Sequence, residues 1–281
     1  MSHGTFSSVL FVAFCLTAPL TLFGQNVTFD PSSRFMLVGD SFTNNGTADW
    51  AAKVDAAPEF DLQFFSVAGR RLDQMDTNFD ADYATATASG PLDAVVIAGG
   101  VNDLSANRTA AQLRSSVESM ISRTNGEHII LTTIAPFRDR IPAFWNQVRQ
   151  DVADQHDAWV RQMATTNPNI SVFDIRAILD LNDDQVPDAE FVSADNFHPQ
   201  SCPLGLSCGM SHIADTFVAQ FATASIILGD VNLDSNVNFL DISPFISVLS
   251  SRSYLPEADV NQNGTVDFLD ISPFIGVLNG Q

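Results

Sequence analysis

A serine follows a short apolar run near the start of the chain, in the stretch Phe35-Met-Leu-Val-Gly39-Asp40-Ser41. The run 35–38 is typical of a buried strand in a parallel sheet, and Gly39 permits a tight turn after it. Ligands of open parallel sheets bind beyond the carboxyl ends of the strands, where Ser41 would lie. Ser41 is therefore a candidate nucleophile, with a helix-capping serine as the alternative.

Three further motifs lie in the order that acyl transfer by a serine would need. They are Ala68-Gly69 after the apolar run 62–67, Gly100-Val101-Asn102-Asp103 after the run 94–98, and Asp195-Asn196-Phe197-His198. Such a reaction requires a base, a carboxylate that orients the base, and donors that face the developing oxyanion. His198 is the candidate base, and Asp195 can reach the other nitrogen of its imidazole from the same loop.

Together the four motifs resemble those of the SGNH (GDSL-type) hydrolase family, over roughly residues 34 to 225. The resemblance implies a serine esterase with a catalytic triad of Ser41, His198 and Asp195 and no cofactor for catalysis. It also implies an oxyanion hole made by the N–H groups of Ser41 and Gly69 and the side-chain amide of Asn102. The fold it implies is α/β, a flavodoxin-like three-layer sandwich with a parallel five-stranded sheet.

The elements that would position these motifs alternate along the chain. Strand-like runs occur at 34–38, 62–67, 93–98, 128–134 and 170–174. Helical patterns occupy 107–123, 142–164 and 209–228, the second with Pro142 in its first turn and an apolar face that includes Val148 and Trp159. This alternation predicts a parallel sheet covered on both faces. Asp40 and Asp103 are expected to bind loop backbone, and Arg70 and Arg71 to contact a substrate or stay solvated.

Residues 229–281 contain an internal repeat with starts at 229 and 258. Each copy contains a loop whose positions are counted from Asp230 or Asp259. Oxygen-bearing side chains stand at positions 1, 3, 5, 9 and 12 of each loop, and position 7 offers a backbone carbonyl. This spacing is typical of an EF-hand-like calcium loop, and its double occurrence disfavours an ordinary solvated turn. The candidate ligands are Asp230, Asn232, Asp234, Asn236, Asn238 and Asp241, then Asp259, Asn261, Asn263, Thr265, Asp267 and Asp270.

The repeat resembles a dockerin over residues 229 to 279. The resemblance implies a small all-α EF-hand-like domain with two Ca²⁺ sites that docks on a cohesin-like partner. Two features depart from the better-known members: Ser235 stands at position 6, where glycine favours the sharp turn, and Phe-Leu pairs stand at positions 10 and 11, where a hydroxyl pair is common. Phe245 and Phe274 are predicted to form a partly exposed apolar docking surface.

Composition and the N-terminus bear on where such a protein works. Residues 1–24 are predicted to be a signal peptide, with a membrane anchor as the competing interpretation and no transmembrane segment in the mature chain. An exported chain with Cys202 and Cys208 close together suggests a disulfide. The formal net charge of −20 opposes nucleic acid and anionic membranes as partners.

The sequence thus predicts a hydrolase domain over 25–228 and a dockerin-like domain over 229–281. The expected function is that of a secreted or cell-surface esterase that removes O-acetyl or other acyl groups from a glycan. A lipid or small-ester acyl hydrolase is the first alternative. The second is a calcium-dependent interaction protein whose hydrolase domain is inactive.

Overall fold

The computed structural model describes residues 27–43, 50–55, 60–138, 144–193, 198–200, 208–222, 228–232, 236–251, 255–261, 263 and 265–279. The predicted signal peptide lies outside the described residues. Among the helices in these ranges, none is both long and apolar enough to cross a membrane.

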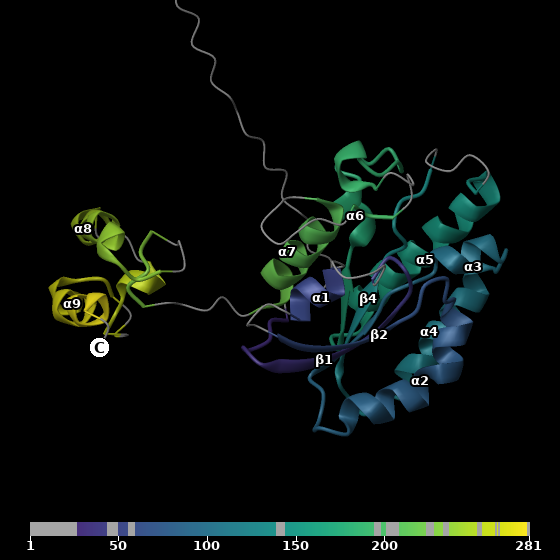
Figure 1. Ribbon diagram of the computed structural model, residues 1–281, viewed down its shortest axis with the longest axis horizontal. Coiled ribbons are helices and arrows are strands. Elements are labelled where there is room, and N and C mark those ends of the chain that lie inside the picture. The colour runs from purple at the N-terminus through teal and green to yellow at the C-terminus, as the bar shows by residue number, and fades with distance from the viewer. Residues whose placement is uncertain are drawn as a thin grey trace, which may run out of the picture.

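A five-stranded parallel sheet forms the centre of the larger part of the molecule (Figure 1). The strands are β1 (Ser33–Gly39), β2 (Phe60–Ser66), β3 (Ala94–Ile97), β4 (His128–Thr132) and β5 (Ile170–Phe173). They lie in the order β2-β1-β3-β4-β5, with Gly39 opposite Ser66 and Val38 opposite Ile97. This is the flavodoxin-like order, and its topological switch point lies between β1 and β3. The predicted α/β class and the five predicted strands are confirmed.

Helices cover both faces of the sheet, as Figure 1 shows, with α1 and α7 on one face and α2, α4 and α5 on the other. The helices of this part are α1 (Trp50–Asp55), α2 (Leu72–Thr87), α3 (Val101–Ser105), α4 (Ala110–Ile121), α5 (Gln147–Thr166), α6 (Ile175–Leu179) and α7 (Gly209–Phe221), with a 3₁₀ turn at Ala189–Phe191. The buried side chains of β1, from Phe35 to Val38, are fully enclosed between the two layers.

Aromatic rings fill the layer beneath α1 and α7. The ring of Phe217 on α7 lies 5.1 Å from Phe173, 5.6 Å from Trp50 and 5.9 Å from Phe60, measured between ring centroids. Phe217 is completely buried. One helix therefore holds strands β2 and β5 and helix α1 together, which fixes the carboxyl ends of the strands where the motifs lie.

Two helices differ from the sequence prediction. Helix α5 begins at Gln147 and not at Pro142, because the side chain of Asn146 accepts a hydrogen bond from the N–H of Arg149 and caps the helix there. Val148, predicted to face the core, is 72% exposed, although Trp159 is buried as predicted. Helix α7 ends at Phe221, earlier than the predicted 228.

The C-terminal region consists of two short helices, each preceded by a 3₁₀ turn. These elements are the turn Phe239–Asp241 with α8 (Ile242–Ser251), a 3₁₀ turn at Pro256–Ala258, and the turn Phe268–Asp270 with α9 (Ile271–Leu278). The rings of Phe245 and Phe274 stack with centroids 4.0 Å apart and planes within 4°. Both side chains are buried, so the prediction of a docking surface on them is wrong: the repeat pairs its two copies through these rings.

Candidate active site

Ser41 and His198 come together at the switch point of the sheet. The Oγ of Ser41 lies 2.9 Å from the Nε2 of His198, although the two residues are far apart in the sequence. Ser41 follows β1 directly and is mostly buried. A serine hydroxyl in contact with an imidazole is the arrangement that activates an oxygen for nucleophilic attack.

The turn that carries Ser41 is fixed by its own neighbours. Asp40 accepts the N–H of Phe42 through its side chain at 2.9 Å, and the Thr43 hydroxyl donates to the Asp40 carbonyl at 2.7 Å. A Cβ at Gly39 would lie only 2.1 Å from the Thr43 oxygen, so the turn requires glycine there. The position of Ser41 is thus set by the backbone rather than by contacts of its own side chain.

The backbone at His198 is held by main-chain hydrogen bonds to the segment 191–193. The N–H of Ser193 donates to the carbonyl of His198 at 2.9 Å, and the N–H of Gln200 donates to the carbonyl of Phe191 at 2.7 Å. The ring of Phe42 packs beside the imidazole, 5.3 Å away between centroids. These contacts hold the imidazole above the serine turn.

Two of the predicted site residues, Asp195 and Cys202, lie outside the described residues. The structure therefore gives no position for the proposed carboxylate of the triad. Cys208, the predicted partner of Cys202, is disulfide-bonded and stands at the N-cap of α7.

Gly69 occupies a tight turn directly after β2. The N–H of Arg70 donates to the carbonyl of Val67 at 3.0 Å, and Gly69 has a φ of +76°, which is the glycine position of a type II turn. In the part of the chain that the structure describes, neither the N–H of Gly69 nor that of Ser41 has a hydrogen-bond acceptor within the protein. Two backbone donors are thus available at the carboxyl ends of neighbouring strands.

Asn102 lies in the first turn of α3, after β3. Its side-chain nitrogen donates to a carboxylate oxygen of Asp40 at 3.1 Å and to the carbonyl of Arg70 at 3.2 Å. These two bonds connect the ends of all three strands that carry the motifs. The sequence suggested the amide as a donor but gave no sign that Asp40 anchors it.

Asp40 and Asp103 are both fully buried beneath the site. Burial raises the pKa of Asp40 to about 7, and the neighbouring Asp103 carboxyl acts in the same direction, against the hydrogen bonds from Phe42 and Asn102. Burial also raises the pKa of Asp103, although the Leu72 N–H and the Arg108 guanidinium favour its ionised form. Both residues bind backbone N–H groups, as the sequence suggested.

The three other described histidines have structural surroundings. His128 contacts the Ser171 hydroxyl at 2.8 Å, and the ring of His212 stacks on Phe191 with centroids 4.8 Å apart. Burial, with the nearby Arg114 and Arg176, lowers the pKa of His156 to about 3. None of the three contacts Ser41, so His198 is the imidazole placed to serve as its base.

In the predicted calcium loops of the C-terminal region, two buried carboxylates have no basic partner among the described residues. Asp241 accepts the N–H groups of Asn232 and Asn238, both at 2.9 Å, and Asp270 accepts the equivalent pair in the second loop. Asp241 and Asp270 are fully buried, and Arg252 is the sole basic residue between 229 and 281. Such carboxylates require a cation to offset their burial, and the mixed oxygen donors suit a hard cation such as Ca²⁺.

Among the described residues, no three Asp, Glu, His or Cys side chains converge closely enough to enclose a metal ion. Asn side chains and backbone carbonyls supply the other positions of the loop pattern. The residues fit calcium by their type and burial, and Asp234 of the first loop lies outside the described residues.

Comparison with known proteins places the chain in a family. The model of the GDSL-like lipase/acylhydrolase family matches residues 37–201, and the model of the Dockerin type I domain matches residues 228–279. The first match covers more than half of the chain. The protein therefore belongs to the GDSL-like lipase/acylhydrolase family, a family of ester hydrolases, and its C-terminal segment is a dockerin type I domain, a calcium-binding module.

Solved structures share the fold. A lipolytic protein of the G-D-S-L family from Veillonella parvula is 20% identical, with a TM-score of 0.52 over 68% of this chain and 98% of that one. A putative lipolytic protein from Desulfitobacterium hafniense is 17% identical, with a TM-score of 0.54 over 68% and 100%. A mutant of an acetyl-xylooligosaccharide esterase from Geobacillus Stearmophilus is 16% identical, with a TM-score of 0.53 over 69% and 96%. A comparison with curated proteins finds no match.

Proposed function

We propose that this protein is an exported serine esterase that removes O-acetyl or other acyl groups from a glycan and is tethered through its dockerin domain. The observation that carries the proposal is the 2.9 Å contact between Ser41 Oγ and His198 Nε2, beside the acceptor-free N–H groups of Ser41 and Gly69. These groups provide the nucleophile, the base and the oxyanion donors that ester hydrolysis needs.

In this mechanism His198 accepts the proton of Ser41 as Oγ attacks the ester carbonyl carbon. The negative charge that develops on the carbonyl oxygen is held by the N–H groups of Ser41 and Gly69. His198 then donates its proton to the leaving alcohol oxygen, and a water molecule, activated by the same imidazole, releases the acid from the serine. Asp195, three residues before His198, would keep the imidazole in the tautomer that this sequence of transfers requires.

Asn102 would supply the third oxyanion donor. Its amide nitrogen carries two hydrogens, and the structure directs them toward Asp40 and the Arg70 carbonyl. The longer of the two bonds, at 3.2 Å to the Arg70 carbonyl, is the one that would be exchanged for the oxyanion. The bond to Asp40 would remain and hold the amide in place during the reaction.

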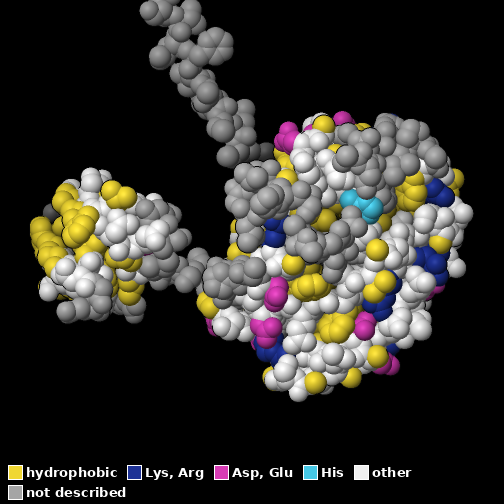
Figure 2. All heavy atoms as spheres, viewed as in Figure 1, with side chains coloured by type: hydrophobic (Ala, Val, Ile, Leu, Met, Phe, Trp, Pro, Cys, Tyr) yellow, Lys and Arg dark blue, Asp and Glu magenta, His cyan; other side chains and the backbone are white. Residues whose placement is uncertain are grey.

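The proposed glycan substrate rests on the presence of a hydrolase domain and a dockerin domain in the same chain. A dockerin domain binds a cohesin, and we propose that a cohesin-like partner brings this esterase to a polysaccharide surface. The exposed Phe-Leu pairs of the two repeats, Phe239-Leu240 and Phe268-Leu269, would give that partner an apolar contact. Figure 2 shows hydrophobic side chains gathered on the surface of the C-terminal module. The acetyl-xylooligosaccharide esterase among the similar structures makes an acetylated glycan a reasonable first substrate.

The experiment that tests the proposal is a substrate panel on the mature protein with Ser41→Ala beside it. Acetylated xylo-oligosaccharides are compared with aryl esters of increasing chain length. Release of acetate from the glycan by the wild type, lost on the order of 10⁴-fold or more in Ser41→Ala with an unchanged circular dichroism spectrum, supports the proposal. A preference for long acyl chains would instead indicate a lipid esterase, and no turnover of any ester would indicate an inactive interaction protein.

A further inference from the structure

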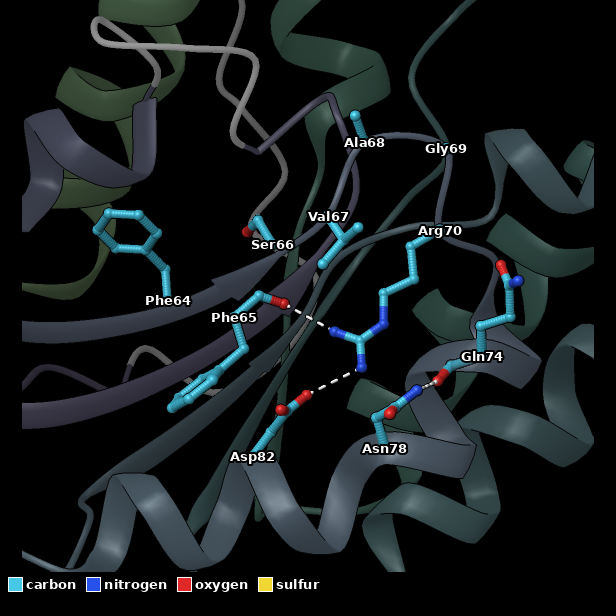
Figure 3. Close-up of a pocket in the computed structure, with 10 residues that line it drawn as sticks. All are labelled: Phe64, Phe65, Ser66, Val67, Ala68, Gly69, Arg70, Gln74, Asn78 and Asp82. Carbon is cyan, nitrogen blue, oxygen red and sulfur yellow. Dashed lines mark hydrogen bonds and ion pairs between the residues drawn. The ribbon is translucent and has the colours of Figure 1, made fainter.

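A cavity of about 520 Å³ opens between the end of β2 and helix α2, beside the turn of Gly69 (Figure 3). Its wall is formed by residues 64–70 and by three side chains of α2, Gln74, Asn78 and Asp82. The volume falls within the range of about 300 to 1,000 Å³ that small-molecule sites occupy. Gly69 and Arg70, both singled out from the sequence, belong to this cavity, whereas Ser41, Asn102 and His198 do not.

The cavity is connected to the active site through Arg70. Its backbone carbonyl accepts the amide of Asn102 at 3.2 Å, while its side chain extends into the cavity, as Figure 3 shows. The Ser66 hydroxyl, also in the cavity wall, donates a hydrogen bond to the Thr43 hydroxyl of the serine turn at 2.7 Å, since the hydrogen of Thr43 is directed to the Asp40 carbonyl. A group bound in the cavity would therefore lie next to an ester held at Ser41.

The guanidinium of Arg70 is fixed and its charge is balanced. It donates to the Phe65 carbonyl and to the Asp82 carboxylate, both at 3.0 Å, and its side chain is 8% exposed (Figure 3). Because the pair carries no net charge, the cavity has no excess of either sign for an ionic ligand. It still presents both donors and acceptors, which favours a neutral ligand rich in hydroxyl groups.

Helix α2 faces the cavity with a polar stripe. Gln74, Asn78 and Asp82 are spaced four residues apart, so they lie on one side of the helix, away from the buried Met75 and Phe79. The Asn78 amide nitrogen donates to the Gln74 carbonyl at 2.7 Å, which leaves its side-chain oxygen as an acceptor toward the cavity. A long acyl chain would desolvate these polar groups without replacing their hydrogen bonds, so the lining disfavours lipid.

We infer that this cavity binds a neutral sugar residue of the substrate, adjoining the sugar that carries the ester. The hydroxyl groups of such a residue would pair with the Asn78 and Gln74 side chains and with the Arg70–Asp82 pair. The half-buried ring of Phe65 in the cavity wall offers an apolar surface for the C–H face of the sugar. This inference rests on the proposed glycan esterase and specifies how that enzyme would recognise the chain around its ester.

The test compares Asn78→Leu with Thr77→Leu in the full chain. Thr77 is the matched control because its hydroxyl donates to the carbonyl four residues earlier, at 2.8 Å, as the Asn78 amide does, yet it lies outside the cavity wall. Asn78→Leu should lower kcat/KM for an acetylated xylobiose about three- to tenfold, mainly through KM, as expected for one lost hydrogen bond. With 4-nitrophenyl acetate the two variants should agree with each other within about twofold, because that ester carries no sugar for the cavity to bind.

Calorimetric titration with unacetylated xylobiose measures sugar binding independently of ester hydrolysis. Weaker binding in Asn78→Leu than in Thr77→Leu supports the sugar site whether or not an ester is hydrolysed. Aryl ester hydrolysis without such a difference overturns the sugar site and leaves the esterase standing. Improved hydrolysis of long-chain aryl esters by Asn78→Leu would also overturn it, since the cavity would then be an acyl site.

Charge provides a second variant. Asp82→Asn removes the carboxylate that neutralises Arg70, so the cavity should gain affinity for a disaccharide that contains a glucuronic acid and lose preference for a neutral one. An acidic disaccharide that binds the wild type more tightly than xylobiose does would contradict the neutral assignment.

Discussion

The two modules of this protein balance their buried charges in different ways. In the hydrolase module, the buried carboxylate of Asp103 is paired with Arg108 at 2.5 Å, within an extensive apolar core. In the dockerin module, Asp241 and Asp270 are fully buried around a small core in which Phe245 stacks on Phe274. In the first module Arg108 supplies the counter-charge of Asp103, whereas the second module is expected to take a cation from solution.

Calcium removal should therefore lower the stability of the dockerin module and leave the hydrolase module unchanged. This is the largest effect expected. Calcium at about a thousandfold excess over its dissociation constant would stabilise the dockerin module by about 4 kcal/mol per site. Chelation should remove this stability and open the module to proteases, as followed by calorimetry and limited proteolysis. Hydrolysis of a soluble aryl ester should be unaffected.

The variant Asp270→Ala provides the control for chelation. It removes the fully buried carboxylate that closes the second loop, so the dockerin module should resemble its chelated state even in calcium. Loss of esterase activity on chelation would contradict the comparison, because it would mean that the hydrolase module also needs the ion. The same is true of calorimetry that detects no calcium uptake by the protein.

Removing one buried phenylalanine ring from either core should cost a similar free energy of unfolding, but only the change in the hydrolase core should affect activity. Phe217→Ala and Phe274→Ala each remove a buried ring, which typically costs about 3 to 5 kcal/mol. Phe217→Ala should lower the unfolding temperature of the hydrolase module and abolish activity near that temperature. Phe274→Ala should leave activity unchanged and destabilise only the dockerin module. Thermal scans with an activity readout would show coupling of the modules if both variants lost activity together.

The pH dependence of stability should reveal the buried Asp40. Its pKa is raised by burial to about 7 from 3.8, so the folded protein holds this proton more tightly than the unfolded chain does. Stability attributable to Asp40 should fall as the pH rises from about 4 to about 7 and then level off, by up to about 4 kcal/mol in total.

Asp40→Asn isolates this contribution. Denaturant unfolding of both proteins between pH 4 and 8 should show the wild type losing stability relative to the variant over that window. A constant difference between the two proteins would mean that Asp40 stays ionised at all these pH values. The Asn102 bond and the Phe42 N–H would then outweigh its burial.

The sequence predicted the sheet well because each strand is a short segment rich in apolar residues that stands between turn or helix patterns. The strand run 34–38 became Ser33–Gly39, and each of the other four differs by no more than two residues at either end. The position of Ser41 followed from the end of the first run. The start of α5 was missed because a cap is a local hydrogen bond: the side chain of Asn146 sets it, whereas Pro142 only permits a helix.

Contacts between distant segments could not be predicted in the same way. The Arg70–Asp82 pair and the Asp40–Asn102 bond depend on side-chain packing between elements, which no periodicity records. The exposure of Phe245 was also predicted wrongly. The sequence Ser-Pro-Phe-Ile occurs in both repeats, at 243–246 and 272–275, which suggested two copies of one surface. In the structure the two repeats instead bring the phenylalanine rings face to face.

One loop of the hydrolase module resembles the second dockerin loop but lacks the carboxylate at position 12. In loop 180–188 the N–H of the fifth residue donates to side-chain oxygens of the first and third residues, both at 3.1 Å. The second dockerin loop makes the same two bonds at 3.0 Å. The twelfth position holds Phe191 in the former and Asp270 in the latter, so side chains can shape such a loop without the carboxylate that closes it.

The smallest effect expected lies between the two dockerin loops. Position 6 is Ser235 in the first loop and Gly264 in the second, and this position favours the left-handed conformation that glycine adopts without strain. The second loop should therefore bind calcium more tightly. Ser235→Gly should raise the affinity of the first loop by up to about fivefold, equivalent to about 1 kcal/mol, and Gly264→Ser should weaken the second loop by a similar factor. Calorimetric titration of the full chain resolves the two sites, with Asp270→Ala identifying the second. Equal affinities in the wild type, or a Ser235→Gly variant that binds less tightly, would show that the turn at position 6 does not limit calcium binding in the first loop.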